Sequence, residues 1–191
     1  MTDETAGTLE PSWDGELAFA VELAGRAGDV LMDHYERLER IDYKSARDLV
    51  TEADHLSEEL IIAAIRERYP ADAILAEESG AHDAMPSGTS EADPAARRVW
   101  VIDPLDGTVN YANGLPHFCV SIGLVVDDRP TVGVVLDPSR DEMFAATADG
   151  AATLNKRPIS ASAKDKLSDY LISLGLSGRS VVTRARALRR E

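Results

Sequence analysis

The residues best suited to chemistry are two carboxylates three positions apart, Asp103 and Asp106, with the hydroxyl of Thr108 close behind them. The backbone carbonyl of Leu105 lies between the two acids. Carboxylate, hydroxyl and carbonyl oxygens are hard ligands, which suit Mg²⁺, Mn²⁺ or Ca²⁺ and do not suit zinc. This stretch therefore predicts a binding site for a hard divalent cation.

The backbone that carries these acids is expected to be a strand that ends in a tight loop. Residues 99–102 are apolar and mostly β-branched, which is typical of a buried strand. Pro104 lacks an N–H group and has a fixed φ, so we expect the strand to stop at Asp103. Gly107 allows a tight turn that directs the side chains on both sides of it into the same space.

Each acid also has a simpler explanation. Asp before Pro and Asp before Gly are common in turns, and an Asp at a strand end is often a helix N-cap. Asp54 falls in the first turn of an expected helix, where the helix dipole alone stabilises a negative charge. The presence of several acidic stretches in one chain favours a site.

A second strand end repeats the pattern of the first. The apolar run 73–76 is followed at once by Glu77 and Glu78, and then by Gly80. If this strand lies beside the strand that precedes Asp103, the side chains of Glu77 and Asp103 emerge at the same edge of the sheet. Like charges at such close range need a cation.

Apolar periodicity predicts two long helices before the second acidic stretch. One covers residues 12–40, with Ser12 as its cap, and has apolar residues three and four apart. The other begins at residue 51 or 52 and ends at residue 69, before Pro70. Its expected buried stripe includes Leu56. A short hairpin over residues 43–50 is expected between the two helices.

The rest of the chain alternates between apolar runs and turn residues. Residues 81–97 have no periodicity and are expected to form an exposed loop. Strands are expected at 118–126, 131–136, 143–147 and near 151–153, and they predict an antiparallel meander. After residue 158 the pattern changes, and we expect a new strand at 170–175 and the start of a helix at 181–190.

Length and composition limit the class of protein. The 191 residues, 44% of them apolar and 28% charged, suit one domain and part of another. We expect an N-terminal α+β metal-binding domain over 1–165 and the beginning of a truncated α/β domain over 166–191. The chain has no apolar run of about 18 residues, and its acidic N-terminus is not a signal peptide. We therefore expect a cytoplasmic protein in which the lone Cys119 is a small buried side chain.

The charge balance argues against nucleic acid and anionic membranes as partners. Asp and Glu number 34 against 20 Lys and Arg, and the net charge of −14 repels both partners and attracts cations. The excess of acid also has a simpler explanation, since it favours solubility. Five arginines in residues 178–191, without aromatic residues between them, are a weak nucleic-acid signal.

Three stretches taken together resemble the inositol monophosphatase family, the magnesium-dependent and lithium-sensitive phosphatases of inositol and sugar phosphates. They are residues 48–54, 77–79 and 100–111, and the resemblance continues to Gly150 and Asn155. It implies a fold of the α+β, layered α/β class, an αβαβα sandwich with an incomplete second domain. It also implies a small phosphorylated polyol or sugar as the substrate, inhibition by Li⁺, and a homodimer in the complete protein.

The resemblance implies a set of metal ligands. Glu77, Asp103 and the carbonyl of Leu105 would hold a first Mg²⁺, for which Mn²⁺ is a possible substitute. Asp103 would bridge to a second Mg²⁺, which Asp106 also binds. Positions that match a mobile loop and a weaker third metal site are Glu78, Lys44 and Asp48.

Other residues would act on the nucleophile and on the phosphate. Thr108, hydrogen-bonded to Asp54, would orient and deprotonate the attacking water together with Glu77. Asp106 and the backbone amides of Gly107 and Thr108 would hold the substrate phosphate. These roles rest on the resemblance alone.

The residues and the resemblance together predict Mg²⁺-dependent hydrolysis of a small phosphate monoester by metal-activated water, with inositol monophosphate as the leading substrate. Two metals supply positive charge to the attacking and the leaving oxygen. A mechanism with an aspartyl nucleophile is disfavoured, because the residue two positions after Asp103 is Leu105 and not an acid. Fructose-1,6-bisphosphatase, or another sugar phosphatase of the same family, is the alternative enzyme.

A non-catalytic metal-binding remnant is the alternative from another class of protein. The family has a further metal-binding Asp in a W-D-x-A-A-G-like motif, and this sequence contains no such motif. We therefore expect this chain to have an intact first metal site and poor or absent turnover.

Overall fold

The computed structural model describes residues 12–35, 41–45, 48–83 and 97–171, with the backbone alone for 41–51. The chain divides into two compact units, Met1–Ile159 and Ser160–Glu191. Two assignments stay predictions: a metal-binding N-terminal domain over 1–165 and the beginning of a second α/β domain over 166–191. Across the described ranges, no helix combines the length and the apolar character that spanning a membrane requires.

The helices of the first unit are α1 (Asp14–His34), α2 (Glu52–Arg68) and the short α3 (Thr108–Ala112). The expected cap at Ser12 is wrong, because the N-cap residue of α1 is Trp13 and no side chain caps the helix. The hydroxyl of Ser12 only accepts from the amide of Asp14, at 3.4 Å. The expected end of α1 near Arg40 is wrong, because the helix ends at His34 and Tyr35 has extended backbone angles. Residues 36–40 lie outside the described residues.

The strands form two sheets. The hairpin of β1 (Ile41–Ser45) and β2 (Asp48–Thr51) is a separate two-stranded antiparallel sheet, as expected. The large sheet has the order β10-β9-β8-β7-β6-β5-β3-β4. Its strands are β3 (Ala73–Ala76), β4 (Gly80–His82), β5 (Arg98–Asp106), β6 (Cys119–Val126), β7 (Arg129–Asp137), β8 (Glu142–Thr147), β9 (Thr153–Leu154) and β10 (Arg157–Pro158).

The large sheet is mixed, because β3 and β5 pair in parallel while the meander from β5 to β10 is antiparallel. The expected meander is confirmed. The exposed loop predicted over 81–97 is wrong at its start, because residues 80–82 form β4 at the sheet edge. This strand is only three residues long and carries no apolar alternation. It therefore depends on its pairing with β3 and has no sequence pattern that would predict it.

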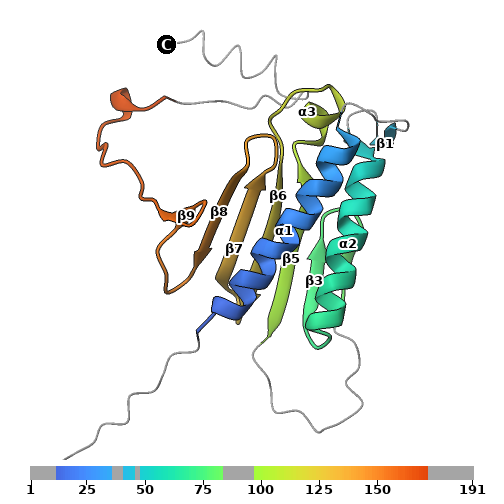
Figure 1. Ribbon diagram of the computed structural model, residues 1–191, viewed down its shortest axis with the longest axis horizontal. Coiled ribbons are helices and arrows are strands. Elements are labelled where there is room, and N and C mark those ends of the chain that lie inside the picture. The colour runs from blue at the N-terminus through green and yellow to red at the C-terminus, as the bar shows by residue number, and fades with distance from the viewer. Residues whose placement is uncertain (1–11, 36–40, 46–47, 84–96, 172–191) are drawn as a thin grey trace, which may run out of the picture. The chain divides into compact units, whose positions relative to one another are not determined.

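Both long helices cover one face of the large sheet, where Figure 1 shows α1 and α2 side by side. α1 packs on β6, β7 and β8, and α2 packs on β5. Trp100 of β5 is fully buried under them, in edge-on contact with the ring of Phe19 at 5.6 Å. The confirmed fold is thus of the α+β, layered class that the sequence predicts.

The buried face of α2 differs from the expected apolar stripe. Leu56 is 38% exposed, so its assignment to the buried stripe is wrong. The first half of the buried face is instead polar, since Asp54, Ser57 and Glu58 are 1%, 0% and 4% exposed. Apolar side chains take over in the second half of the helix, where Ile61 and Ile65 are fully buried.

Strand β5 does not stop at Asp103, as expected from Pro104, but continues to Asp106. Its pairing with β6 shifts there, because Asp103 is opposite Ser121 while Asp106 is opposite Cys119. Three steps along β5 thus match two steps along β6, which is a β-bulge. A bulge is one of the few places where a strand accepts proline, since the extra residue interrupts the ladder of hydrogen bonds.

The second unit is described only up to residue 171. Residues Leu167–Asp169 form one 3₁₀ turn, and the hydroxyl of Tyr170 donates to the carbonyl of Lys164 at 2.5 Å. The strand expected at 170–175 does not begin at its first two residues, and the side chain of Leu171 is 98% exposed. Residues 172–175 and the helix expected at 181–190 lie outside the described residues.

Candidate active site

The parallel pairing of β3 and β5 brings two acids to the same sheet edge. The pairing puts Ala76 opposite Ile102, so the next residues, Glu77 and Asp103, leave their strands together. The amide of Glu77 donates to the carbonyl of Ile102 at 3.2 Å, which extends the ladder by one bond. The predicted juxtaposition of these two acids therefore exists.

The closeness of Glu77 changes the acidity of Asp103. Burial, a hydrogen bond to Glu77 and the charges of Glu77 and Asp106 together raise the pKa of Asp103 to about 7. The amide of Leu105, 3.1 Å from Asp103 Oδ1, lowers this pKa but does not offset the rise. A carboxylate that is forced to share a site with other carboxylates is typical of functional sites.

The bulge after Asp103 orients the third ligand named by the sequence, the carbonyl of Leu105. The Leu105 side chain is 1% exposed and anchors the bulge in the core. Its carbonyl accepts a hydrogen bond from Thr108 Oγ1 at 3.0 Å. The backbone oxygen is thus held at the polar end of β5, near the acids.

Asp54 and Thr108, expected as partners, lie in hydrogen-bonding range. Thr108 Oγ1 is 3.3 Å from Asp54 Oδ1 and 3.0 Å from the Leu105 carbonyl, while it has a single hydrogen to donate. Asp54 is 1% exposed, on the buried face of α2. Its position in the first helical turn therefore does more than complement the helix dipole, because it contacts the residue that begins α3.

Gly107 links the bulge to α3 and tolerates no side chain. Its φ is +97°, in the left-handed region that favours glycine. A Cβ at this position would lie 2.8 Å from the carbonyl oxygen of His117 and 3.1 Å from Cα of Phe118. The expected tight turn at Gly107 is present, and it is followed by the one-turn helix α3, which the sequence did not predict.

The metal ligands named by the sequence are brought together only in part. Glu77 and Asp103 form a contacting pair, and Asp106 is close enough to raise the pKa of Asp103. The carboxylate of Asp106, however, accepts a long contact from the Cys119 thiol, with Sγ 3.9 Å from Oδ2. Within residues 12–35, 41–45, 48–83 and 97–171, no three His, Cys, Asp or Glu side chains are grouped as a metal ion requires. The pair offers the carboxylate oxygens that a hard cation prefers, while the carboxylate of Asp106 lies toward Cys119.

The residues of the expected loop and third metal site are spread over two regions. Glu78 is half-buried directly after Glu77, and its amide donates to Glu58 Oε2 at 3.0 Å. Lys44 lies at the irregular step of the pairing between β1 and β2, and Asp48 begins β2. The side chains of these last two lie outside the described residues, so their roles stay predictions.

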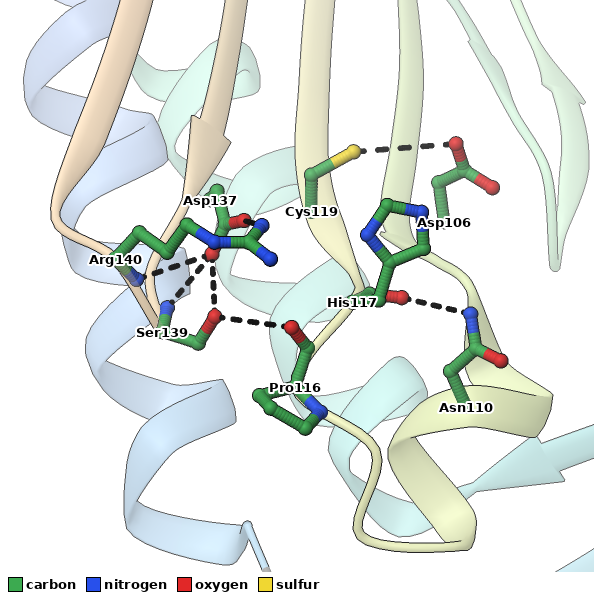
Figure 2. A network of polar contacts seen from close by, with 8 residues as sticks. All are labelled: Asp106, Asn110, Pro116, His117, Cys119, Asp137, Ser139 and Arg140. Carbon is green, nitrogen blue, oxygen red and sulfur yellow. Dashed lines mark hydrogen bonds and ion pairs between the residues drawn. The ribbon is translucent and has the colours of Figure 1, made fainter. Parts of the chain in front are cut away.

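A cavity of about 460 Å³ lies beside Asp106 and Gly107. It opens over the ends of β5, β6 and β7, and Figure 2 shows the polar groups around it. Asp137, at the end of β7, binds the guanidinium of Arg140 at 2.5 Å and accepts from the Ser139 hydroxyl at 2.6 Å. The cavity next to the acidic sheet edge is therefore lined by a positively charged side chain, Arg140, which Asp137 holds in position.

Cys119 lines this cavity, which corrects its assignment as a buried core residue. The side chain is only partly buried, because β6 begins at this point and faces the bulge of β5. Burial and the nearby charges of Asp106, Asp103 and Asp137 raise the pKa of the thiol to about 11. The thiol therefore stays protonated at neutral pH.

Sequence reasoning missed two sets of residues at this site. Ser57 and Glu58 follow Asp54 by three and four positions, a spacing that puts all three on one helix face and that was available as a signal. Asp137 and Arg140 follow a strand, as Glu77 does, but a single acid and an arginine after a strand are too common to indicate a cavity. Only the packing of the strand ends identifies them.

These contacts define a class of protein: a mixed sheet covered by helices, with paired acids where its two parallel strands end. The chain belongs to the inositol monophosphatase family, whose model matches residues 13–190. It is 36% identical over 157 residues to "Inositol monophosphatase 3" of Solanum lycopersicum, covering 82% of this chain and 56% of that relative. The "Nus factor SuhB" of Xylella fastidiosa is 38% identical over 161 residues, covering 83% and 54%.

A solved structure agrees with this assignment. The Thermotoga maritima IMPase superposes with a TM-score of 0.67 at 32% identity, covering 78% of this chain and 54% of that one. The chain thus spans about half the length of the relatives that it matches. The sequence prediction of the family is confirmed.

Proposed function

We propose that the protein hydrolyses a small phosphate monoester in a metal-dependent reaction, with inositol monophosphate as the leading substrate. The observation that carries the proposal is the contact between Glu77 and Asp103 where β3 and β5 end, close to Asp106. Acids at such range repel one another and are stabilised by a cation. Membership of the inositol monophosphatase family supports phosphate ester hydrolysis as the use of that cation.

The proposed cofactor is Mg²⁺, with Mn²⁺ as a substitute and Li⁺ as an inhibitor. Glu77, Asp103 and the Leu105 carbonyl would hold a first ion, and Asp103 with Asp106 a second. The carboxylate of Asp106 is exposed, so it is free to turn from the Cys119 thiol toward Asp103. When bound, such ions lower the pKa of a water and neutralise the charge of the phosphate.

The chain's own residues would orient the nucleophile. In this proposal Asp54 accepts the hydroxyl hydrogen of Thr108, so that the lone pairs of Thr108 are available to the attacking water. Glu77 would take the other proton of that water. The distances of 3.3 Å from Thr108 to Asp54 and 3.0 Å to the Leu105 carbonyl support a hydroxyl that can exchange one acceptor for the other.

The substrate would lie across Gly107. Asp106 and the backbone amides of Gly107 and Thr108 would bind the phosphate, and the adjoining cavity would receive the polyol or sugar. Arg140 and Asp137 offer that part a donor and an acceptor side by side, which suits vicinal hydroxyl groups. A homodimer in the cytoplasm is the proposed form of the protein.

Phosphate release tests the proposal. Inositol 1-phosphate and fructose 1,6-bisphosphate are incubated with the purified protein under a titration of Mg²⁺, and Mn²⁺ binding is measured by calorimetry. We expect Mn²⁺ to bind and phosphate release to be slow, in line with the poor turnover expected above. That release should saturate with Mg²⁺, favour inositol 1-phosphate and be abolished by Asp103→Asn. Binding of Mn²⁺ without any release would favour the non-catalytic metal-binding alternative, and absence of both would overturn the proposal.

A further inference from the structure

We propose that Glu58 is a positioning residue, which holds the backbone of the segment that carries Glu77 and so sets the place of that acid. It touches neither substrate nor metal in this role. The inference rests on the proposed function, because it takes Glu77 as a metal ligand.

Glu58 uses both of its carboxylate oxygens on two consecutive backbone amides. Oε2 accepts from the amide of Glu78 at 3.0 Å, and Oε1 accepts from the amide of Ser79 at 3.0 Å. Hydrogen bonds to an ionised carboxylate are stronger than those between neutral groups. A helix side chain thus holds the backbone directly after Glu77, twenty residues further along the chain.

The two bonds complete the support of this segment. The amide of Glu77 itself is held by β5, through the carbonyl of Ile102 at 3.2 Å. Three successive amides, at 77, 78 and 79, are therefore fixed, the first by the sheet and the next two by α2. The side chain of Glu77 is exposed, so packing does not hold it and the backbone determines where it starts.

Glu58 is one of three buried polar residues on the same face of α2, with Asp54 and Ser57. Asp54 accepts from Thr108, and the hydroxyl of Ser57 donates to the carbonyl of Pro104 at 3.3 Å. Each residue thus contacts a different segment of the site: the start of α3, the bulge of β5 and the segment after β3. One rigid helix therefore sets the relative positions of all three segments.

The burial of Glu58 argues that this arrangement serves the site. A carboxylate that is 4% exposed has lost most of its hydration, and two amide bonds offset that cost without a large net gain. An apolar residue would contribute more to stability at a buried helix position. Outer residues that orient metal ligands have this character, and replacing them weakens metal affinity by about 10–100-fold.

The test compares Glu58→Gln with Glu59→Gln, its exposed neighbour on the same helix. Glutamine keeps the size of Glu58, but its side-chain NH₂ group is a donor and would face a backbone N–H that needs an acceptor. Thermal unfolding, amide hydrogen exchange at residues 77–79 and calorimetric titration with Mn²⁺ are measured on the full chain. Glu58→Ala is a second variant. It removes both acceptors and should therefore weaken Mn²⁺ binding more than Glu58→Gln does.

We expect Glu58→Gln to remain folded and the amide hydrogens of Glu78 and Ser79 to exchange faster than in the parent protein. Its affinity for Mn²⁺ should fall by up to roughly 10-fold. Glu59→Gln should match the parent protein in all three measurements. Unchanged Mn²⁺ affinity in Glu58→Gln, in a parent protein that binds Mn²⁺, would overturn this inference alone. A parent protein that binds no Mn²⁺ would overturn the proposed function, and this inference with it.

Discussion

The two ends of strand β5 use acids in opposite ways. At its first residue, Arg98 binds Asp72 and Glu16, each at 3.0 Å, and Trp100 Nε1 donates to the same Asp72 at 2.9 Å. At its last residues, Asp103 contacts a second carboxylate, that of Glu77, and the charge of a third, Asp106, further raises the pKa of Asp103. One end balances its charges, and the other concentrates charge of one sign.

The pKa values of the two ends reflect this difference. Burial works against the charge of Arg98, but Asp72 and Glu16 hold the pKa of its guanidinium above the ordinary value. Burial and carboxylate neighbours raise the pKa of Asp103 to about 7. Charges are paired where the strand only has to be held, and they are left in conflict where we propose that a ligand binds.

The largest expected effect on stability is at the paired end. Asp72→Ala leaves the buried Trp100 N–H without its acceptor and removes one partner of Arg98, so we expect unfolding free energy to fall by about 3 kcal/mol. Urea unfolding measures it. Asp128→Asn removes the exposed charge that faces Arg97 at 3.8 Å and keeps a residue type suited to the left-handed turn, so it is the control and should cost less than about 1 kcal/mol. Equal losses in both variants would remove the contrast between the two ends.

The opposite result is expected at the acidic end. Asp103→Asn removes a like charge and keeps an oxygen for the Leu105 amide, so the melting temperature in chelator should not fall. Affinity for Mn²⁺ should fall by on the order of 100-fold or more, since even supporting residues contribute 10–100-fold. Differential scanning fluorimetry and calorimetry measure the two quantities. A clear loss of stability in chelator would mean that Asp103 is a structural acid like Asp72.

A smaller effect is expected where Thr108 joins the bulge to α2. Thr108→Val removes the hydroxyl that lies within hydrogen-bonding distance of Asp54 Oδ1 and of the Leu105 carbonyl. We expect the unfolding free energy to fall by about 1 kcal/mol. Thr108→Ser keeps the hydroxyl and should lose less than half of that amount. If both variants lose the same amount in urea unfolding, the methyl group rather than the hydroxyl supports the site.

The smallest effect concerns Asp137, a paired acid at the acidic end. Burial works against its charge, yet hydrogen bonds from Ser139 and Arg140 and the charge of Arg140 hold the pKa of Asp137 below its ordinary value. The unfolded chain therefore binds more protons in this range, and the stabilisation is present at neutral pH and is lost as the pH falls from about 4. We expect a loss below about 1 kcal/mol, because the Arg140 side chain is 52% exposed.

Melting temperatures between pH 2 and 6 measure that loss. Arg140→Ala should make the melting temperature less dependent on pH in this range, because Asp137 then loses its cationic partner. A pH profile that Arg140→Ala leaves unchanged would show that other acids dominate the titration.

Much of the fold was predictable from local patterns. The apolar runs before Glu77 and before Asp103 predict two strands, and their shared ending in acid predicts that they are neighbours. Both predictions hold, although only one face of each strand is buried, since Leu75 and Val101 are 47% and 39% exposed. Pro104 misled the prediction of the strand end, because the rule against proline in strands does not apply at a bulge.

The supporting residues of the candidate site were not predictable in the same way. Glu58 on a helix is most simply expected to face solvent, as its neighbour Glu59 does. The difference between them is the packing of α2 on β5, which turns one residue toward the segment after β3. Arg140 is held locally by Asp137, and the packing of β5, β6 and β7 decides that this pair lies beside the cavity near Asp106.

The sequence by itself determined the family, the two strands and the acids at their ends, because residue type and short spacing directly limit backbone conformation and ligand chemistry. The tertiary structure alone decided which acids touch, since that depends on the parallel register of β3 and β5 and on a bulge one residue long. It also decided which acids are neutralised. A carboxylate's partner is determined by distances of a few ångströms between segments that the chain order leaves far apart.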